Sequence, residues 1–132
     1  MTQSRSTTPA RQYAVRTFAF MGGYTAIMLL MITGALDPIV GTAGAWLLAA
    51  AVTMPVLGQT WAVLAFMRDS DEFMRAVMAK RFIVAAGLAI SLFAGWGFAE
   101  AFAGAPHMEG YIVYALFWGC FGLVTPFIRS SQ

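Results

Sequence analysis

The sequence predicts an all-α integral membrane protein, a four-helix bundle with up-down-up-down topology and both termini in the cytoplasm. Of its 132 residues, 60% are apolar and 11% are charged, whereas soluble domains have about 45–50% and about 25%. The apolar residues form four blocks, and all basic residues lie in the N-terminal tail, the central connection or the C-terminus. Because basic loops stay on the cytoplasmic side during insertion, we expect four crossings. The basic residues are Arg5, Arg11, Arg16, Arg68, Arg75, Lys80, Arg81 and Arg129.

Four spans and their short connections use nearly the whole chain, which predicts a single membrane domain over 1–132 with a cytoplasmic tail at 1–16. Thr8 and Pro9 fit the N-cap and the first position of a helix. The first span is expected at 17–36, because roughly 20 uncharged residues suffice to cross a ~30 Å hydrocarbon layer. Asp37 and Pro38 then form a short outer turn.

The second span is expected at 43–67, with Pro55 near its middle. Proline removes a backbone donor and clashes with the preceding turn, so the helix should kink there. Gln59 follows one turn later, and its amide either joins two helices through a hydrogen bond or lines a small cavity. Small residues that recur every four positions predict a helix-packing seam. These are Gly41, Ala45, Ala49 and Thr53.

The central connection, 68–81, is expected to be a helical cytoplasmic loop. Asp69 and Glu72 have the spacing of a capping box, which predicts a helix start near Ser70. No strong helix breaker follows before position 103, so this helix should project two to three turns into the cytoplasm before its span at 82–102. The fourth span is expected at 111–128.

Four ionisable residues are expected on the outer side: Asp37, Glu100, His107 and Glu109. Glu100 lies 19 residues after Arg81, roughly 28 Å along a helix, which places it at the outer boundary. Helix ends are neighbours in a compact bundle, so the four side chains should gather. They either form a divalent-metal or pH-sensing site or are solvated loop residues. Since the single histidine lacks a paired ligand spacing, no metal site is predicted.

No catalytic residue is predicted, because the chain has no nucleophile–base set, P-loop or dinucleotide fingerprint. A transmembrane haem needs axial ligands inside the spans and a retinal needs an intramembrane lysine. His107 is in a loop and Lys80, the only lysine, is at the inner boundary. We therefore expect no cofactor and no enzyme. Topology and lipid headgroups explain the basic residues, which argues against direct nucleic-acid binding.

Residues 71–75 read Asp-Glu-Phe-Met-Arg, and the apolar span that follows closes with Gly-Phe-Ala-Glu at 97–100. This pattern resembles a loose, largely uncharacterised group of small bacterial multi-pass membrane proteins, which carry an Asp-Glu-aromatic-x-Arg segment before a span and Gly-Phe-x-Glu near its end. The resemblance covers residues 71–100. It implies a location in the bacterial inner membrane and a regulatory or interaction role.

The expected function is that of a non-enzymatic protein of the cell inner (plasma) membrane. Its partners are the lipid bilayer and a protein contacted at the cytoplasmic face through Asp71, Glu72, Phe73 and Arg75. The alternative is a small transporter or channel, in which the Pro55 kink, Gln59 and the outer acidic mouth form a path. A homo-oligomer is compatible with either role.

Overall fold

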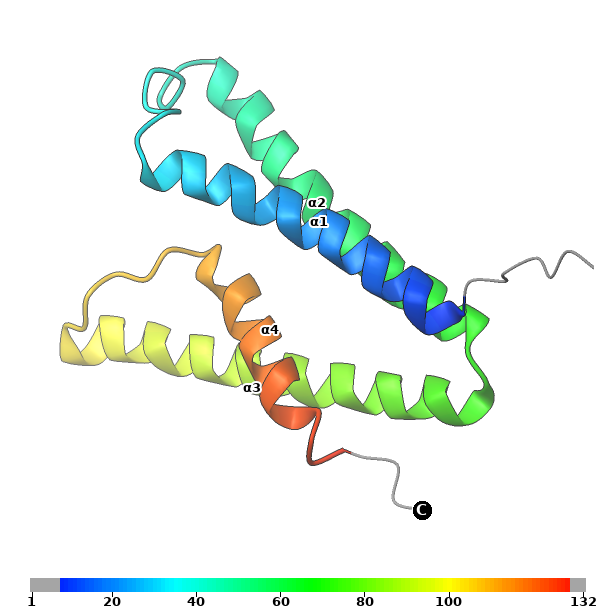
Figure 1. The fold of residues 1–132 in the computed structure, drawn as a ribbon. Helices are drawn as coiled ribbons and strands as arrows, with labels where there is room; N and C mark the ends of the chain where they lie inside the picture. Colours follow the sequence, from blue (N-terminus) through cyan, green and yellow to red (C-terminus); the bar gives the residue numbers. More distant parts are fainter. Residues whose placement is uncertain (1–7, 129–132) are drawn as a thin grey trace, which may run out of the picture. The chain divides into compact units, whose positions relative to one another are not determined.

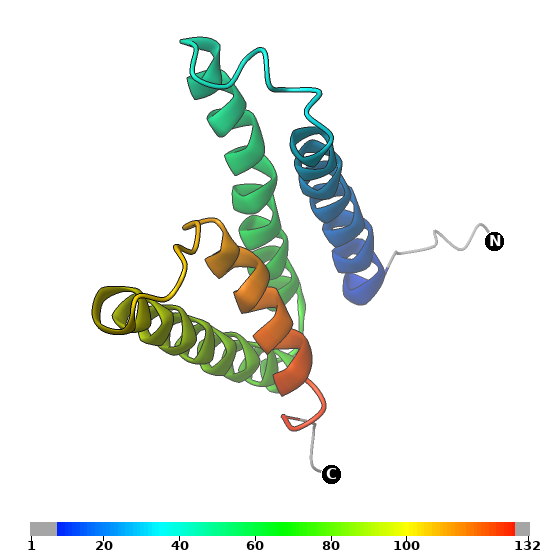
Figure 2. The same ribbon diagram turned by 90° about the vertical axis from the view of Figure 1, so that its left-hand side faces the viewer.

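A computed structural model describes residues 8–128, and within this range all regular secondary structure is α-helical. The helices are α1 (Pro9–Ile32), α2 (Gly44–Asp69), α3 (Glu72–Ala103) and α4 (Ile112–Val124). They divide into two compact units, residues 1–70 and 71–132, each of which is a helical hairpin (Figures 1 and 2). The all-α prediction is confirmed, whereas the packing of the hairpins into one bundle stays a prediction.

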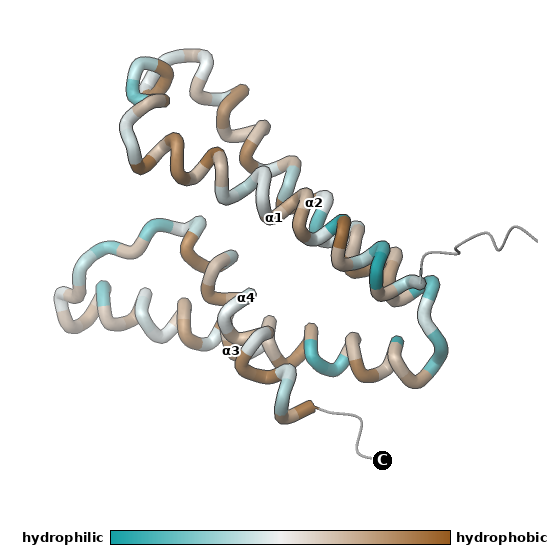
Figure 3. Tube along the Cα trace, viewed as in Figure 1, coloured by the Kyte–Doolittle hydropathy of each residue, from teal (hydrophilic) through white to brown (hydrophobic). Residues whose placement is uncertain are grey.

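Three of the helices are long and apolar enough to cross a membrane: α1, α2 and α3, with 24, 26 and 32 residues. Figure 3 shows hydrophobic residues along most of their length and hydrophilic residues near the α2–α3 connection. The fourth helix is shorter than the predicted span at 111–128, because α4 has only 13 residues. That length is about 20 Å, less than a ~30 Å hydrocarbon layer.

Hydrogen-bonded turns extend α4 at both ends. The Ile112 N–H donates to Glu109 O at 3.1 Å, and the Ile128 N–H donates to Val124 O at 3.0 Å. Such turns are frequent at the ends of α-helices, where the assigned boundary varies by one or two residues. Hydrogen-bonded turns therefore continue to Ile128, although the regular α-helix ends at Val124.

The first helix ends four residues before the predicted limit of the span at 17–36. Gly34 has φ +77°, its N–H donates to Met31 O, and the Ala35 N–H donates to Leu30 O, each at 3.1 Å. This pair of bonds is a Schellman ending, in which glycine takes the left-handed conformation at low cost. At the other end, Pro9 begins α1 as predicted, although the Thr8 side chain makes no capping bond.

Antiparallel contacts join α1 and α2. The Gln59 amide donates from Nε2 to Thr17 Oγ1 at 3.1 Å, near the point where the Phe20 ring lies against Gly58. Further contacts continue this register along the hairpin: Tyr13 with Phe66 (ring centroids 4.9 Å apart), Arg16 with Trp61, and Gly23 near Pro55.

The predicted small-residue seam does not form the α1–α2 contact. Gly41 lies before α2 with φ +80°, and Ala49 and Thr53 are exposed. Instead, the buried face of α2 lies in its second half, because the tight approach at Gly58 brings that half against α1. Its buried residues are Gln59, Ala62, Val63, Ala65 and Phe66.

The α3–α4 hairpin has a core of small residues and aromatic rings. Ala85 and Ala89 of α3 and Cys120 of α4 are buried, and Leu116, Phe117 and Phe121 pack against them. The Phe82 and Phe117 rings lie 4.7 Å apart. Near the start of the predicted span at 82–102, Arg81 Nε donates to Ile128 O at 2.9 Å. This contact brings the end of the α4 segment to Arg81.

The start of α3 differs from the predicted capping box. Asp69 is the last residue of α2, and Ser70 is extended, with φ −95° and ψ 159°. The N-cap is Asp71, whose Oδ1 accepts a hydrogen bond from the Met74 N–H at 2.8 Å. The predicted start near Ser70 is therefore wrong by two residues, since the carboxylate that reaches a free N–H of the first turn is that of Asp71.

Candidate functional site

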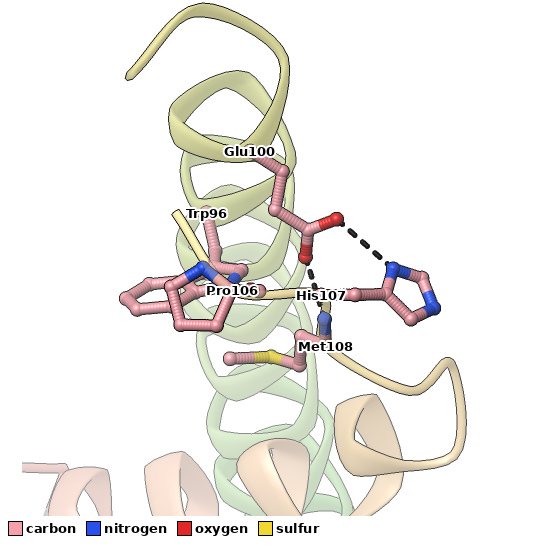
Figure 4. A network of polar contacts seen from close by, with 5 residues as sticks. All are labelled: Trp96, Glu100, Pro106, His107 and Met108. Atoms are coloured by element: carbon pink, nitrogen blue, oxygen red, sulfur yellow. Dashed lines mark hydrogen bonds and ion pairs between the residues drawn. The ribbon is translucent and has the colours of Figure 1, made fainter. Parts of the chain in front are cut away.

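The end of α3 and the loop after it form a compact polar network (Figure 4). Glu100 Oε1 accepts a hydrogen bond from the Met108 N–H at 2.7 Å, and Glu100 Oε2 lies 3.1 Å from His107 Nδ1. One turn earlier, Trp96 Nε1 donates to Pro106 O at 3.0 Å. Two side chains of the helix thus hold three successive loop residues.

Local backbone geometry explains why the loop returns to Glu100. Gly104 has φ +69°, a left-handed conformation that ends α3, and the Ala105 N–H donates back to Ala99 O at 3.2 Å. The chain therefore turns along the last helical turn instead of leaving it. Both carboxylate oxygens of Glu100 are used in tying the loop down.

Of the four residues predicted to gather on the outer side, the structure brings two into contact, Glu100 and His107. Asp37 belongs to the first hairpin, and Glu109 contributes its carbonyl oxygen to the turn that begins α4. Across residues 8–128, no three His, Cys, Asp or Glu side chains lie close enough to hold a metal ion. The arrangement that is present is a loop anchor.

Gln59 lies inside the first hairpin and is fully buried. Its Nε2 donates to Thr17, and Tyr13 also interacts with Thr17 and Gln59. Among residues 8–128, its Oε1 has no hydrogen-bond partner. A buried amide in an apolar hairpin gains from each bond that satisfies it. Of the two roles considered for Gln59, the geometry shows the hydrogen bond between helices.

The first turns of α3 carry the residues predicted to contact a protein. Glu72, Phe73 and Arg75 are exposed, and 53% of Phe73 is accessible. Further along α3, Met78 is buried, with 6% accessibility. Asp71 differs from its neighbours, since its carboxylate caps the helix.

Sequence reasoning missed two contacts of the first hairpin. One is the hydroxyl partner of Gln59, and the other is the Arg16 guanidinium, which lies 4.6 Å from the centre of the Trp61 ring. The residue types carry a signal, because arginine commonly stacks on tryptophan. The pairing itself depends on the register of α1 against α2, which is set by how their side chains fit together.

The fold therefore defines an all-helical protein of two hairpins, with three helices whose length and composition suit a membrane. Comparisons with protein-family models, with curated proteins and with solved structures find no match to the chain. Its function has to be argued from its own residues.

Proposed function

We propose that this chain is a four-span, non-enzymatic protein of the cell inner membrane that contacts a protein partner through the exposed start of α3. The observation that carries the proposal is the projection of α3 beyond α4. The α4 helix ends at Val124, and the turn after it lies beside Arg81, whose Nε donates to Ile128 O. In contrast, α3 begins nine residues before Arg81, at Glu72.

Helix length supports a projecting segment. The 32 residues of α3 extend about 48 Å, and about 20 of them suffice to cross the hydrocarbon layer. The rest would stand in the cytoplasm, and they include Glu72, Arg75 and Lys80. Phe73 is exposed among charges of both signs, and aromatic residues are enriched in protein interfaces.

Hairpin geometry supports the proposed placement of both termini in the cytoplasm. The start of α1 lies beside the end of α2, as the contact between Tyr13 and Phe66 indicates. The end of the α4 segment lies beside the start of the α3 span at Arg81. The start of α1 and the last described turn after α4 therefore each lie at the end of the hairpin that joins the basic 68–81 segment, which the charge rule assigns to the cytoplasm.

Extra turns make a fourth span feasible. The hydrogen-bonded path from Glu109 to Ile128 covers 20 residues, or about 30 Å at a helical rise. Without those turns α4 would be too short.

Site-specific photocrosslinking tests the proposed interaction. A photoreactive amino acid at Phe73 should give a discrete protein adduct in native membranes, and the Glu72→Lys/Arg75→Glu variant should lose it. The same amino acid at Leu92, which is 57% exposed on the same helix, is the matched control. Asp71 stays unchanged, because its substitution would disturb the helix start. The proposed interaction would be rejected if no discrete adduct formed at Phe73, or if the adduct formed equally well in the Glu72→Lys/Arg75→Glu variant.

The alternative of a small transporter or channel receives less support. Gln59 is buried and bonded to the neighbouring helix, and Glu100 is tied to its own loop. Flux measured in proteoliposomes for the wild type, Gln59→Ala and Glu100→Gln separates the two functions, since the interaction role predicts no flux in any of them.

A further inference from the structure

We infer that the exposed face of α1, near its first residues at the cytoplasmic end of the first hairpin, binds the headgroup of an anionic phospholipid through Arg11 and Arg16. This inference rests on the membrane insertion proposed above and is independent of the protein partner at α3. Arg11, Gln12, Val15 and Arg16 surround a shallow open hollow on this helix, whose lining atoms are the apolar parts of these side chains.

The charge at this site is unbalanced. Residues 1–36 contain no acidic residue, and within residues 8–128 no ion pair joins Arg11 or Arg16 to a carboxylate. Arg68, at the same end of the hairpin, is paired with a carboxylate, because its Nε lies 3.3 Å from Asp69 Oδ1. A guanidinium presents several N–H donors in a planar fork that matches a phosphate group.

The Arg16 side chain is held in place by the second helix. Its guanidinium lies 4.6 Å from the centre of the Trp61 ring, and half of Trp61 is exposed. Tryptophan prefers the boundary between lipid and water. Stacking on the ring limits the conformations of Arg16 and leaves its N–H edges available to a ligand.

Exposed apolar residues next to the arginines favour a lipid over an acidic peptide. Val15 and Phe18 are 63% and 80% exposed, and they follow Arg11 at positions i+4 and i+7, so all three share a face. Arg16 directly precedes the predicted span at 17–36, and Arg11 lies about 7.5 Å earlier along the helix. Both would therefore stand at headgroup level, with Phe18 beside the acyl chains.

Fluorescence quenching by brominated lipids tests the site in the full chain. Trp61 is kept as the only tryptophan by replacing Trp46, Trp96 and Trp118 with phenylalanine. The protein is reconstituted in vesicles of phosphatidylcholine containing brominated phosphatidylcholine or brominated phosphatidylglycerol. The relative binding constant of the two lipids beside Trp61 is the measured quantity. Quenching by brominated phosphatidylcholine alone checks insertion, so failed insertion is distinguishable from a failed headgroup site.

We expect phosphatidylglycerol to bind more tightly than phosphatidylcholine, with the preference falling about fivefold for each arginine removed. Arg11→Gln/Arg16→Gln should abolish it, and Arg16→Lys should retain part of it. Arg68→Gln is the matched control at the same end of the hairpin and should change nothing.

Three outcomes would overturn the inference. Equal binding of the two lipids would show that the site does not recognise the headgroup. An equal loss in Arg68→Gln would show diffuse attraction to basic residues. Displacement of phosphatidylglycerol by inorganic phosphate would assign the site to a free anion. Circular dichroism of each variant identifies any that fail to fold, and Arg16→Lys then provides the comparison.

Discussion

Replacing Gly58 with alanine is the most direct test of the α1–α2 contact. A Cβ at this position would lie 2.7 Å from Phe20 Cζ and closer still to two other ring carbons. The ring or the helix must therefore shift. Overpacking of this kind costs about 1–3 kcal/mol, while the change from glycine to alanine within a helix gains about 1 kcal/mol.

Gly22→Ala provides the matched control. Gly22 is exposed in the same hairpin, and a Cβ there meets nothing within 4 Å. Both substitutions gain the same helix propensity, so their difference isolates the overlap with Phe20. We expect Gly58→Ala to be about 1–3 kcal/mol less stable than Gly22→Ala.

Reversible unfolding in mixed detergent micelles, followed by circular dichroism, measures the difference. In a Phe20→Ala background the overlap is absent, and Gly58→Ala should then cost no more than Gly22→Ala. Equal stability of the two single variants, within about 0.5 kcal/mol, would refute the close approach of α1 and α2 at Gly58.

Three further predictions concern the polar contacts. Gln59→Leu and Thr17→Val should each destabilise the first hairpin by about 0.6 kcal/mol, with an upper bound of about 1.7 kcal/mol. Unfolding of the double variant should show that the two losses of stability are not additive. Additive losses would contradict a hydrogen bond shared by the two side chains. Asp71→Ala should lower the stability by about 1 kcal/mol through loss of the helix cap, whereas Asp69→Ala should have little effect. Thermal unfolding followed by circular dichroism measures both. A larger loss for Asp69→Ala would favour the capping box predicted from the sequence. Glu100→Gln should accelerate hydrogen exchange at the loop amide it holds, because a neutral acceptor binds an N–H more weakly than a carboxylate; mass spectrometry of the loop peptide measures this, and unchanged exchange would argue against the anchor.

Composition and spacing determined much of the secondary structure. The start at Pro9 agrees with the sequence, since proline suits the first helical position. Long apolar runs also predicted three of the helices, because only a helix satisfies its own backbone in an apolar environment. Helix ends were less accurate: the first helix stops before the left-handed Gly34, and the third begins two residues later than expected. These boundaries depend on single hydrogen bonds that several neighbouring side chains are able to make.

The candidate sites were predictable in part. The exposed turn at Phe73 follows from the position of the segment between two apolar blocks. The contact between Glu100 and His107 required Gly104 to turn the loop back, and nothing in the spacing of seven residues shows that turn.

By itself, the sequence determined an all-helical chain with apolar helices and segregated basic residues, because hydrophobicity and charge act on each residue wherever its neighbours lie. Only the tertiary structure decided that Gln59 meets Thr17, that Arg16 stacks on Trp61 and that Gly58 receives the Phe20 ring. Such pairs depend on the register of two antiparallel helices, which is set by how side chains fit together along the whole contact.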